Sequence, residues 1–215
     1  MFTGIIGETG KIASLQRHGE GYRISIKSEK ILKELALGDS IAVNGICLTV
    51  TWISDNSFSA DISRETYERT SIPFSKEGFM VNLETPCKPD SFLSGHIVSG
   101  HIDTTAVITG IHKKKEFCEM TFELKEARDR KYIIEKGSIA VNGVSLTIYN
   151  VQGSIFSVSI IPETSGRTSL PHLSEGMTVN IEFDIIGKYI IKWLEERPET
   201  RNSNISSLLH KSGFI

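Results

Sequence analysis

The residues of this chain that could do chemistry stand at matching places in two copies of one motif. Cys47 lies in the run SIAVNGICLT, and Ser145 lies in the run SIAVNGVSLT, 98 residues further along (40 to 138). A thiol is a nucleophile once it loses its proton, whereas a hydroxyl donates and accepts hydrogen bonds. Two related sites with different reactive atoms indicate two related ligands held side by side.

A third candidate, His101, breaks the symmetry of the repeat. Its equivalent in the first copy is Ile5, 96 residues earlier (5 to 101). Because histidine exchanges protons near neutral pH, one pocket would have a titratable group that the other lacks. His96 has no such rationale from the repeat, and we interpret it as structural. A zinc site made by the two histidines is not expected, since no thiol or carboxylate spacing completes it.

Each candidate also has an ordinary structural interpretation. Most free cysteines are small buried hydrophobic residues, and a serine in a strand usually hydrogen-bonds locally. An isolated histidine is more often structural than catalytic. The asymmetry between the two copies favours a functional interpretation.

The elements that would position these residues are short strands. Runs that alternate between apolar and polar residues, such as 22–27, 58–62 and 156–160, predict half-buried strands. Asn44-Gly45 and Asn142-Gly143 predict tight hairpin turns, whose two central residues need positive φ. Many short strands at regular spacing predict an all-β fold of small barrels or sandwiches. Strands are also expected at 79–84 and 177–182, and short helices at 29–35 and 126–135.

The duplication divides the chain into two domains, which we expect over residues 1–92 and 93–186. Pro86 and Pro89 interrupt the strand pattern in a linker over 85–92. After Asp184, apolar residues recur at three- and four-residue steps, which predicts an amphipathic helix ending near Arg197-Pro198. This helix, in a C-terminal segment of residues 187–215, can dock on the barrels of its own chain or form an oligomer contact. Residues after 200 are expected to be weakly ordered.

Composition excludes several classes of protein. The net charge is −2 with 39% hydrophobic residues, so neither a disordered chain nor a nucleic-acid-binding protein is expected. Lys113–Lys115 is typical of a solvated turn. No apolar run reaches about 18 residues, and the first residues lack the features of a signal peptide, so a membrane is not an expected partner. Three cysteines without metal spacing favour a reducing cytoplasm.

Five short motifs, taken in order, resemble the riboflavin synthase family, in the alpha-chain type with two lumazine-binding repeats. They are MFTGII at 1–6, NGICLT at 44–49, SGHI at 99–102, GVSLT at 143–147 and IPET at 161–164. The resemblance covers residues 1 to about 193. It implies two homologous six-stranded antiparallel β-barrels in tandem plus a C-terminal α-helix, which joins three chains in a homotrimer.

The resemblance also implies a reaction. Two molecules of 6,7-dimethyl-8-ribityllumazine dismutate into riboflavin and 5-amino-6-(ribitylamino)uracil by transfer of a four-carbon unit. Donor and acceptor are the same compound, so no metal or redox cofactor is expected. The family site lies between the N-terminal barrel of one subunit and the C-terminal barrel of its neighbour, and lumazine synthase is a candidate partner. The motifs leave open which barrel holds the donor.

The site residues follow from the same resemblance. Catalytic roles fall on Cys47, Ser145 and His101, the last handling the proton of the C7 methyl group. Substrate-binding positions in the first half are Phe2, Thr3, Gly4, Ile5, Ile6, Leu48, Thr49, Asp61, Ile62, Ser63, Arg64, Glu65 and Thr66. In the second half they are Gly100, Ile102, Lys136, Leu146, Thr147, Ser159, Ile160, Ile161, Pro162, Glu163, Thr164 and Asp184.

Some of these positions carry more specific expectations. Asp61–Thr66 and Ser159–Thr164 are expected to be strand ends, at which Glu65 and Glu163 would hold ribityl hydroxyls. Phe2 and Thr3 would lie at the acceptor ring. The chain departs from the family pattern at Asn142, where many members have aspartate, and an amide cannot act as a general base. Ser94 also replaces the first glycine of the usual Gly-Gly-His.

Three other functions are compatible with parts of the pattern. A lumazine antenna would hold a chromophore without chemistry, but it would not need Cys47, His101 and Ser145 together. The flavin-binding barrel of a reductase would need a following G-x-G-x-x-G unit, which this sequence does not contain. A purely structural tandem barrel would not explain the asymmetry of the two sites.

Overall fold

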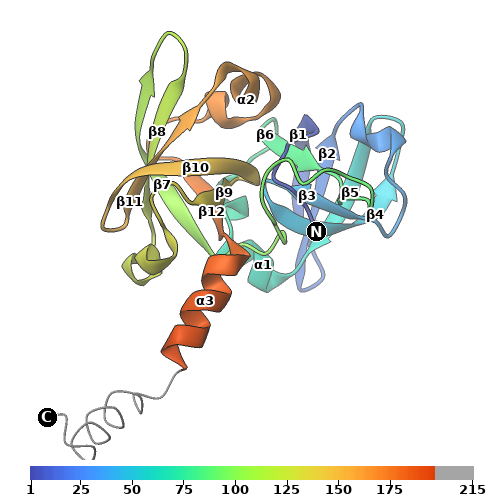
Figure 1. The fold of residues 1–215 in the computed structure, drawn as a ribbon. Coiled ribbons are helices and arrows are strands. Elements are labelled where there is room, and N and C mark those ends of the chain that lie inside the picture. The colour runs from blue at the N-terminus through green and yellow to red at the C-terminus, as the bar shows by residue number, and fades with distance from the viewer. Residues whose placement is uncertain (197–215) are drawn as a thin grey trace, which may run out of the picture. The chain divides into compact units, whose positions relative to one another are not determined.

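The computed structural model describes residues 1–196 of the chain. Residues Met1–Ile185 form one compact unit, and a second unit begins at Ile186. The first unit contains two barrels, shown with strands β1–β6 on the right and β7–β12 on the left in Figure 1.

The first barrel is closed by six antiparallel strands in the order β1-β2-β5-β4-β3-β6. Closure leaves no open sheet edge. The strands are β1 (Glu8–His18), β2 (Gly21–Lys27), β3 (Ser40–Val43), β4 (Ile46–Ile53), β5 (Ser57–Ile62) and β6 (Met80–Glu84).

The second barrel repeats this topology with the order β10-β11-β8-β7-β12-β9, which is the same cyclic order of equivalent strands. The predicted pair of six-stranded antiparallel barrels is confirmed. Its strands are β7 (Thr104–Lys113), β8 (Cys118–Leu124), β9 (Ser138–Val141), β10 (Val144–Gln152), β11 (Ile155–Ile160) and β12 (Thr178–Phe183).

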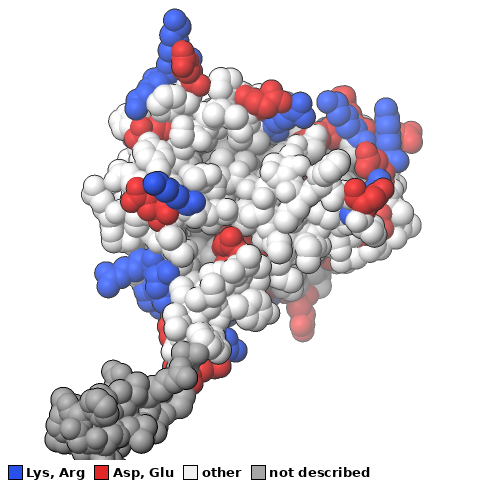
Figure 2. All heavy atoms as spheres, viewed as in Figure 1, with Lys and Arg blue, Asp and Glu red and all other residues white. Residues whose placement is uncertain are grey.

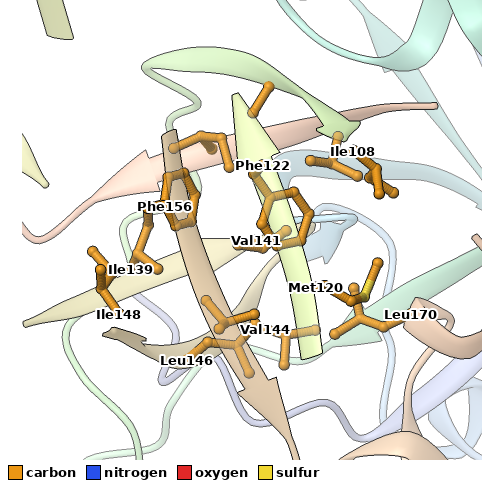
Figure 3. Close-up of a cluster of buried hydrophobic side chains, with 14 of the residues drawn as sticks. Ile108, Met120, Phe122, Ile139, Val141, Val144, Leu146, Ile148, Phe156 and Leu170 are labelled. Carbon is orange, nitrogen blue, oxygen red and sulfur yellow. The ribbon is translucent and has the colours of Figure 1, made fainter. Parts of the chain in front are cut away.

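Each barrel has its own apolar core. Figure 3 shows the core of the second barrel, where Phe122 and Phe156 stack with ring centroids 5.3 Å apart. Ile108, Ile139 and Ile148 pack around these rings, and each is at most 1% exposed. Burying such a side chain contributes about 1.5–3 kcal/mol, so the inward-facing residues hold the barrel closed.

The two predicted Asn-Gly turns are confirmed and meet each other. Asn44 and Asn142 have φ of 46°, and Gly45 and Gly143 have φ of 78°. A Cβ atom added to Gly45 would lie 2.8 Å from the backbone nitrogen of Gly143. Glycine is therefore required in these turns both for conformation and for the contact between the barrels.

Two buried asparagines tie the barrels together. The Nδ2 of Asn82 donates to the backbone oxygen of Asn142 at 2.9 Å, and its Oδ1 accepts from the nitrogen of Ser169 at 2.7 Å. Asn180 makes the reciprocal contacts, with Asn44 at 2.9 Å and Ser71 at 2.6 Å. Since buried amides are costly unless hydrogen-bonded, these paired contacts fix the two barrels in one symmetric arrangement.

The opening segment of each half crosses to the other barrel. Phe2 and Val98 exchange backbone hydrogen bonds of 2.7 and 3.1 Å, which pairs the two segments. Ile6 belongs to the core cluster of the second barrel, whereas Ile102 packs against that of the first. The chain thus exchanges equivalent segments between its halves.

The helical elements differ from the prediction. The helices expected at 29–35 and 126–135 are 3-10 turns, η1 (Ile31–Lys33) and η3 (Ala127–Tyr132). Two further 3-10 turns, η2 (Ile72–Phe74) and η4 (Leu170–His172), follow short α-helices that the sequence did not predict, α1 (Arg64–Arg69) and α2 (Pro162–Arg167).

The expectation that Asp61–Thr66 and Ser159–Thr164 are strand ends is therefore wrong in part. Glu65 and Glu163 lie in the first turns of α1 and α2. The Oγ of Ser63 accepts from the nitrogen of Thr66 at 3.0 Å and caps α1, while Pro162 begins α2. Helices of six residues are too short to produce a helical period in the sequence.

The second unit begins with the predicted amphipathic helix, α3 (Ile185–Glu195). Its apolar residues Ile186, Tyr189, Ile190 and Trp193 share one face by their spacing. The predicted end near Arg197-Pro198 and the tail lie outside the described residues, and the domain limits at 92 and 186 stay predictions. Within residues 1–196, no helix has the length and apolar character needed to cross a membrane.

Candidate functional site

Each barrel has a pocket beside the residue of its motif that is predicted to be catalytic, Cys47 or Ser145. The first has a volume of about 230 Å³ and the second about 270 Å³. The first is lined by Ile46, Cys47, Glu65, Thr66, Arg69, Thr70, Gly100, His101 and Ile102. The second is lined by Val144, Ser145, Glu163, Thr164, Arg167, Thr168, Gly4, Ile5 and Ile6.

Every lining residue of one pocket is the repeat equivalent of a lining residue of the other. Cys47 in the first pocket corresponds to Ser145 in the second, and His101 corresponds to Ile5. The first pocket therefore offers a thiol and an imidazole where the second offers a hydroxyl and an aliphatic side chain. This is the geometry expected for two copies of one ligand that undergo different chemistry.

The opening segments lie directly against the reactive residues. The backbone nitrogen of Ser145 donates to the oxygen of Gly4 at 2.8 Å, and that of Cys47 donates to the oxygen of Gly100 at 2.8 Å. A Cβ atom on Gly4 would lie 2.7 Å from the Cβ of Ser145, and one on Gly100 would lie 2.5 Å from that of Cys47. Both glycines also have positive φ, which disfavours any residue with a Cβ atom. Larger residues are therefore excluded by the backbone conformation as well as by the close contact.

Two buried glutamates hold the opening segments in place. The carboxylate of Glu84 accepts from the nitrogen and Oγ1 of Thr3, at 2.7 and 2.8 Å, and from the nitrogen of Gly4 at 3.0 Å. Glu182 accepts from Ser99 and Gly100 in the same way. Burial raises the pKa of both carboxyl groups, although the accepted hydrogen bonds act in the opposite direction. The sequence prediction missed these residues, because the repeated V-N-hydrophobic-Glu pattern does not show what each carboxylate contacts.

His96 lies against Ser145, a position that the sequence did not predict. Its Nδ1 is 2.7 Å from the Oγ of Ser145, and its side chain is almost fully buried. Burial lowers the pKa of His96, against an opposing effect of the charge on Asp184. The Nε2 atom is buried and has no hydrogen-bond partner within residues 1–196. The signal available in the sequence was the tetrapeptide SGHI, which occurs at 94–97 and again at 99–102.

The rims of the two pockets carry matching ion pairs. Arg69 pairs with Glu65 at 3.3 Å across one turn of α1, and Arg167 pairs with Glu163 at 2.5 Å across one turn of α2. Both arginines are largely exposed. Exposed pairs of this kind contribute little stability, so the guanidinium groups are available to hydrogen-bond polar groups of a ligand.

Several predicted binding residues do not line either pocket. Leu48, Ile62, Leu146 and Ile160 belong to the barrel cores. Phe2 is fully buried beside Cys47 in a small cluster with Ala42, Val98 and Ala140. The binding roles of these residues stay predictions.

The remaining predicted residues are placed outside the two linings. Asp61 pairs with Arg23 at 2.6 Å, and Arg64 pairs with Glu68 at 2.7 Å. Lys136 is exposed with φ of 66° in the turn before β9. Thr49 and Thr147 are exposed on β4 and β10, two residues after Cys47 and Ser145. Ser159, Ile161 and Pro162 are also exposed. Asp184 directly follows β12.

Comparison with known proteins agrees with this geometry. The family model of the lumazine binding domain matches residues 3–86 and again residues 99–184. The paired barrels and pockets are therefore those of a lumazine-binding protein with two repeats. Riboflavin synthase of Actinobacillus pleuropneumoniae is 45% identical over 219 residues, and that of Bacillus subtilis (strain 168) is 42% identical over 217, each match covering all of both chains. The chain belongs to the riboflavin synthase family.

Solved structures show the same fold. LumP complexed with riboflavin has a TM-score of 0.79 and 27% identity, covering 85% of this chain and 99% of that one. LumP complexed with 6,7-dimethyl-8-(1'-D-ribityl) lumazine has a TM-score of 0.77 and 26% identity over the same shares.

Proposed function

We propose that this chain is a transferase that makes riboflavin from two molecules of 6,7-dimethyl-8-ribityllumazine. A four-carbon unit passes from one lumazine to the other, which releases 5-amino-6-(ribitylamino)uracil. The observation that carries the proposal is the residue-by-residue equivalence of the two pockets, combined with their difference at Cys47/Ser145 and at His101/Ile5.

The equivalence explains how two identical molecules are bound. Related pockets present the same Glu-Arg pair and the same glycine backbone to each ring system, so each holds one lumazine in a related orientation. Fixing two reactants in a reactive geometry contributes roughly 7–11 kcal/mol toward lowering the barrier. The difference at the reactive positions then makes one molecule the donor and the other the acceptor.

In the first pocket, Cys47 and His101 act together. The thiol of Cys47 adds to the bound ring or transfers a proton to it, and the imidazole of His101 handles the proton of the acidic C7 methyl group. Both groups belong to one lining, although they come from β4 of the first barrel and the opening segment of the second half.

In the second pocket, Ser145 acts with His96. Burial lowers the pKa of His96 and so favours the neutral imidazole, whose unprotonated nitrogen can accept the proton of the serine hydroxyl 2.7 Å away. Asn142 does not serve as the base, because its Oδ1 accepts from the nitrogen of Asn180 and its side chain is buried between the barrels.

A single assay tests the proposed reaction. The purified protein is incubated with the lumazine alone, without added metal or nicotinamide, and riboflavin is measured by its absorbance and fluorescence. We expect one riboflavin for every two lumazines consumed. Tight binding of lumazine without formation of riboflavin would instead favour a chromophore-binding role, which the likeness to ligand-bound LumP makes the second candidate.

We further propose that the enzyme is a cytoplasmic homotrimer. The amphipathic face of α3 supports a helix-mediated contact, and Cys47, Cys87 and Cys118 are all free, as suits a reducing compartment. Sedimentation equilibrium should give three times the chain mass of 23.9 kDa, and a chain ending at Ile185 should not assemble. Lumazine synthase is the proposed partner, and co-sedimentation of the two purified proteins tests it.

A further inference from the structure

The second barrel carries another pocket, of about 350 Å³, that shares no lining residue with the two described above. It lies between the β7–β8 hairpin, α2 and η4. Pro162 and Ser165 of α2 line it, whereas Glu163, Thr164 and Arg167 line the lumazine pocket. The two pockets therefore lie on different sides of one short helix.

The lining is apolar at its base and charged at its rim. The apolar part consists of Ile111, Met120, Ile160, Pro162, Leu170, Pro171 and Leu173, with the half-buried Cys118 beside them. The rim is the tip of the β7–β8 hairpin, with Lys113, Lys114, Lys115, Glu116 and Phe117. Figure 2 shows the charged side chains of this hairpin standing out at the top of the view.

The first barrel has the same framework, and at the equivalent place it has a hollow of about 360 Å³ that Tyr22 and Tyr67 line. The strand register pairs Arg17 with Tyr22 in the first barrel and Lys113 with Cys118 in the second, so Cys118 is the equivalent of Tyr22. Tyr67 and Ser165 likewise occupy the same place in α1 and α2.

The rings of Tyr22 and Tyr67 stack with centroids 3.6 Å apart and an angle of 10° between their planes. In the second barrel the two smaller residues Cys118 and Ser165 stand in place of this stack and line the pocket. The pocket thus includes the position that an aromatic pair holds in the first barrel.

We propose that this pocket binds a small planar aromatic anion of one or two rings. The ring would take the place of the absent tyrosines against the apolar base, and its acidic group would meet the lysines at the rim. The volume lies at the lower end of the range for small-molecule sites. The Nζ of Lys114 already donates to Glu119 at 3.0 Å and lies over the ring of Phe117. Lys113 and Lys115 therefore supply the electrostatic attraction for the anion, and the negative charge of the neighbouring Glu116 weakens that attraction.

The first test measures binding of 2-naphthoate to the full-length protein by calorimetry, with 2-naphthalenemethanol as a neutral probe of the same shape. We expect saturable binding of the anion with a dissociation constant of about 1 mM or below, and at least threefold weaker binding of the neutral probe. The variant Lys113→Gln/Lys115→Gln should reduce the difference between the two probes. Absence of saturable binding by either probe would overturn the proposal.

The second test rebuilds the aromatic pair in the second barrel. The variant Cys118→Tyr/Ser165→Tyr rebuilds the stack of the first barrel, and we expect it to weaken naphthoate binding at least tenfold while riboflavin formation continues. The matched control Tyr67→Phe alters the other barrel and should bind naphthoate as the unmodified protein does. Binding that survives the double tyrosine variant would place the ligand elsewhere.

A third measurement needs no variant and applies even if the tyrosines prevent folding. Site-resolved mass spectrometry follows alkylation of Cys118 and Cys87 by iodoacetamide above pH 8, since burial raises the pKa of the Cys118 thiol. Naphthoate should slow alkylation of Cys118 at least threefold and leave Cys87 unchanged. Equal rates with and without naphthoate would contradict the proposal.

Discussion

The Nδ1 atom of His96 lies 2.7 Å from the Oγ atom of Ser145, although 49 residues separate them in the chain. The other reactive residue, Cys47, shares its pocket with His101. Each of these two predicted catalytic side chains therefore lies near a histidine, and both histidines come from the short stretch that joins the two barrels. The two pairs differ in burial, since His96 is buried and His101 is exposed.

The contact predicts that His96 and Ser145 act as one unit. His96→Gln and Ser145→Ala should each lower kcat by about 10²-fold, the lower end of the usual effect of a general acid or base. The double variant should be no worse than the poorer single variant, because both remove the same interaction. Steady-state kinetics on the three proteins measures this. Multiplicative losses in the double variant would show that the two residues act independently.

The burial of His96 predicts a loss of stability in mild acid. Its pKa is lowered from 6.5 in the folded protein, so the unfolded chain takes up the proton first as the pH falls. The stabilising contribution is complete above pH 6.5 and is lost as the pH falls through the lower, folded pKa. Urea unfolding at pH 7.5 and 5.5 should show a smaller loss for His96→Gln than for the unmodified protein. Equal losses would remove His96 as the cause.

Glu84 and Glu182 contribute with the opposite sign, because burial raises their pKa values. Their stabilising contribution grows as the pH falls through the raised folded pKa and is complete below the unfolded value of 4.5. Both the unmodified protein and His96→Gln contain these glutamates. The contribution of His96 is therefore the difference between their two changes in unfolding free energy.

His101 is expected to matter for turnover rather than for binding. His101→Ala should lower kcat by about 10²-fold and change the dissociation constant of the lumazine less than threefold, since the side chain acts on a proton in the transition state. His112→Ala, at an exposed position on β7 outside both pockets, is the matched control. An unchanged kcat in His101→Ala would exclude the residue from the mechanism.

The close approach of Gly4 to Ser145 predicts a strong effect of one added methyl group. Gly4→Ala should destabilise the protein and reduce riboflavin formation, because the new Cβ would lie 2.7 Å from the Cβ of Ser145. Gly176→Ala is the control, since Gly176 has φ of 83° but no atom within 4 Å of the added Cβ. The control should cost only about 1–2 kcal/mol for its left-handed backbone conformation. Equal losses of stability in Gly4→Ala and Gly176→Ala would mean that the close approach of Gly4 to Ser145 does not limit the side chain at position 4.

The asparagine network predicts that the barrels depend on each other for stability. Asn82→Ala removes hydrogen bonds to Asn142 and Ser169 and leaves buried backbone groups without partners. Such groups cost about 1–3 kcal/mol each, so the free energy of unfolding should fall by at least 2 kcal/mol. Asn56→Ala, at an exposed turn, should change it by less than about 0.5 kcal/mol. Chemical denaturation compares the three proteins.

Much of this architecture could be predicted from the sequence, because duplication gives each signal twice. The Asn-Gly turns and the alternating strands appear in both copies, and Cys47 and Ser145 stand at equivalent positions of the motif, where their catalytic roles stay predictions. The helices α1 and α2 could not be predicted, since six residues give no period and their caps resemble the end of a strand. Glu84 and His96 were missed for another reason. Their roles depend on contacts with Thr3 and Ser145, which are distant in the chain and become neighbours only after the opening segments exchange.

The exchanged segments also limit how this protein can evolve. A substitution at Ile5 lies in one half of the gene but alters the pocket of the other half, and the same holds for His101. A change at either position therefore alters a pocket to which the other half contributes most of the lining. Each pocket therefore depends on both halves of the gene, and a copy of one half alone would lack part of its lining.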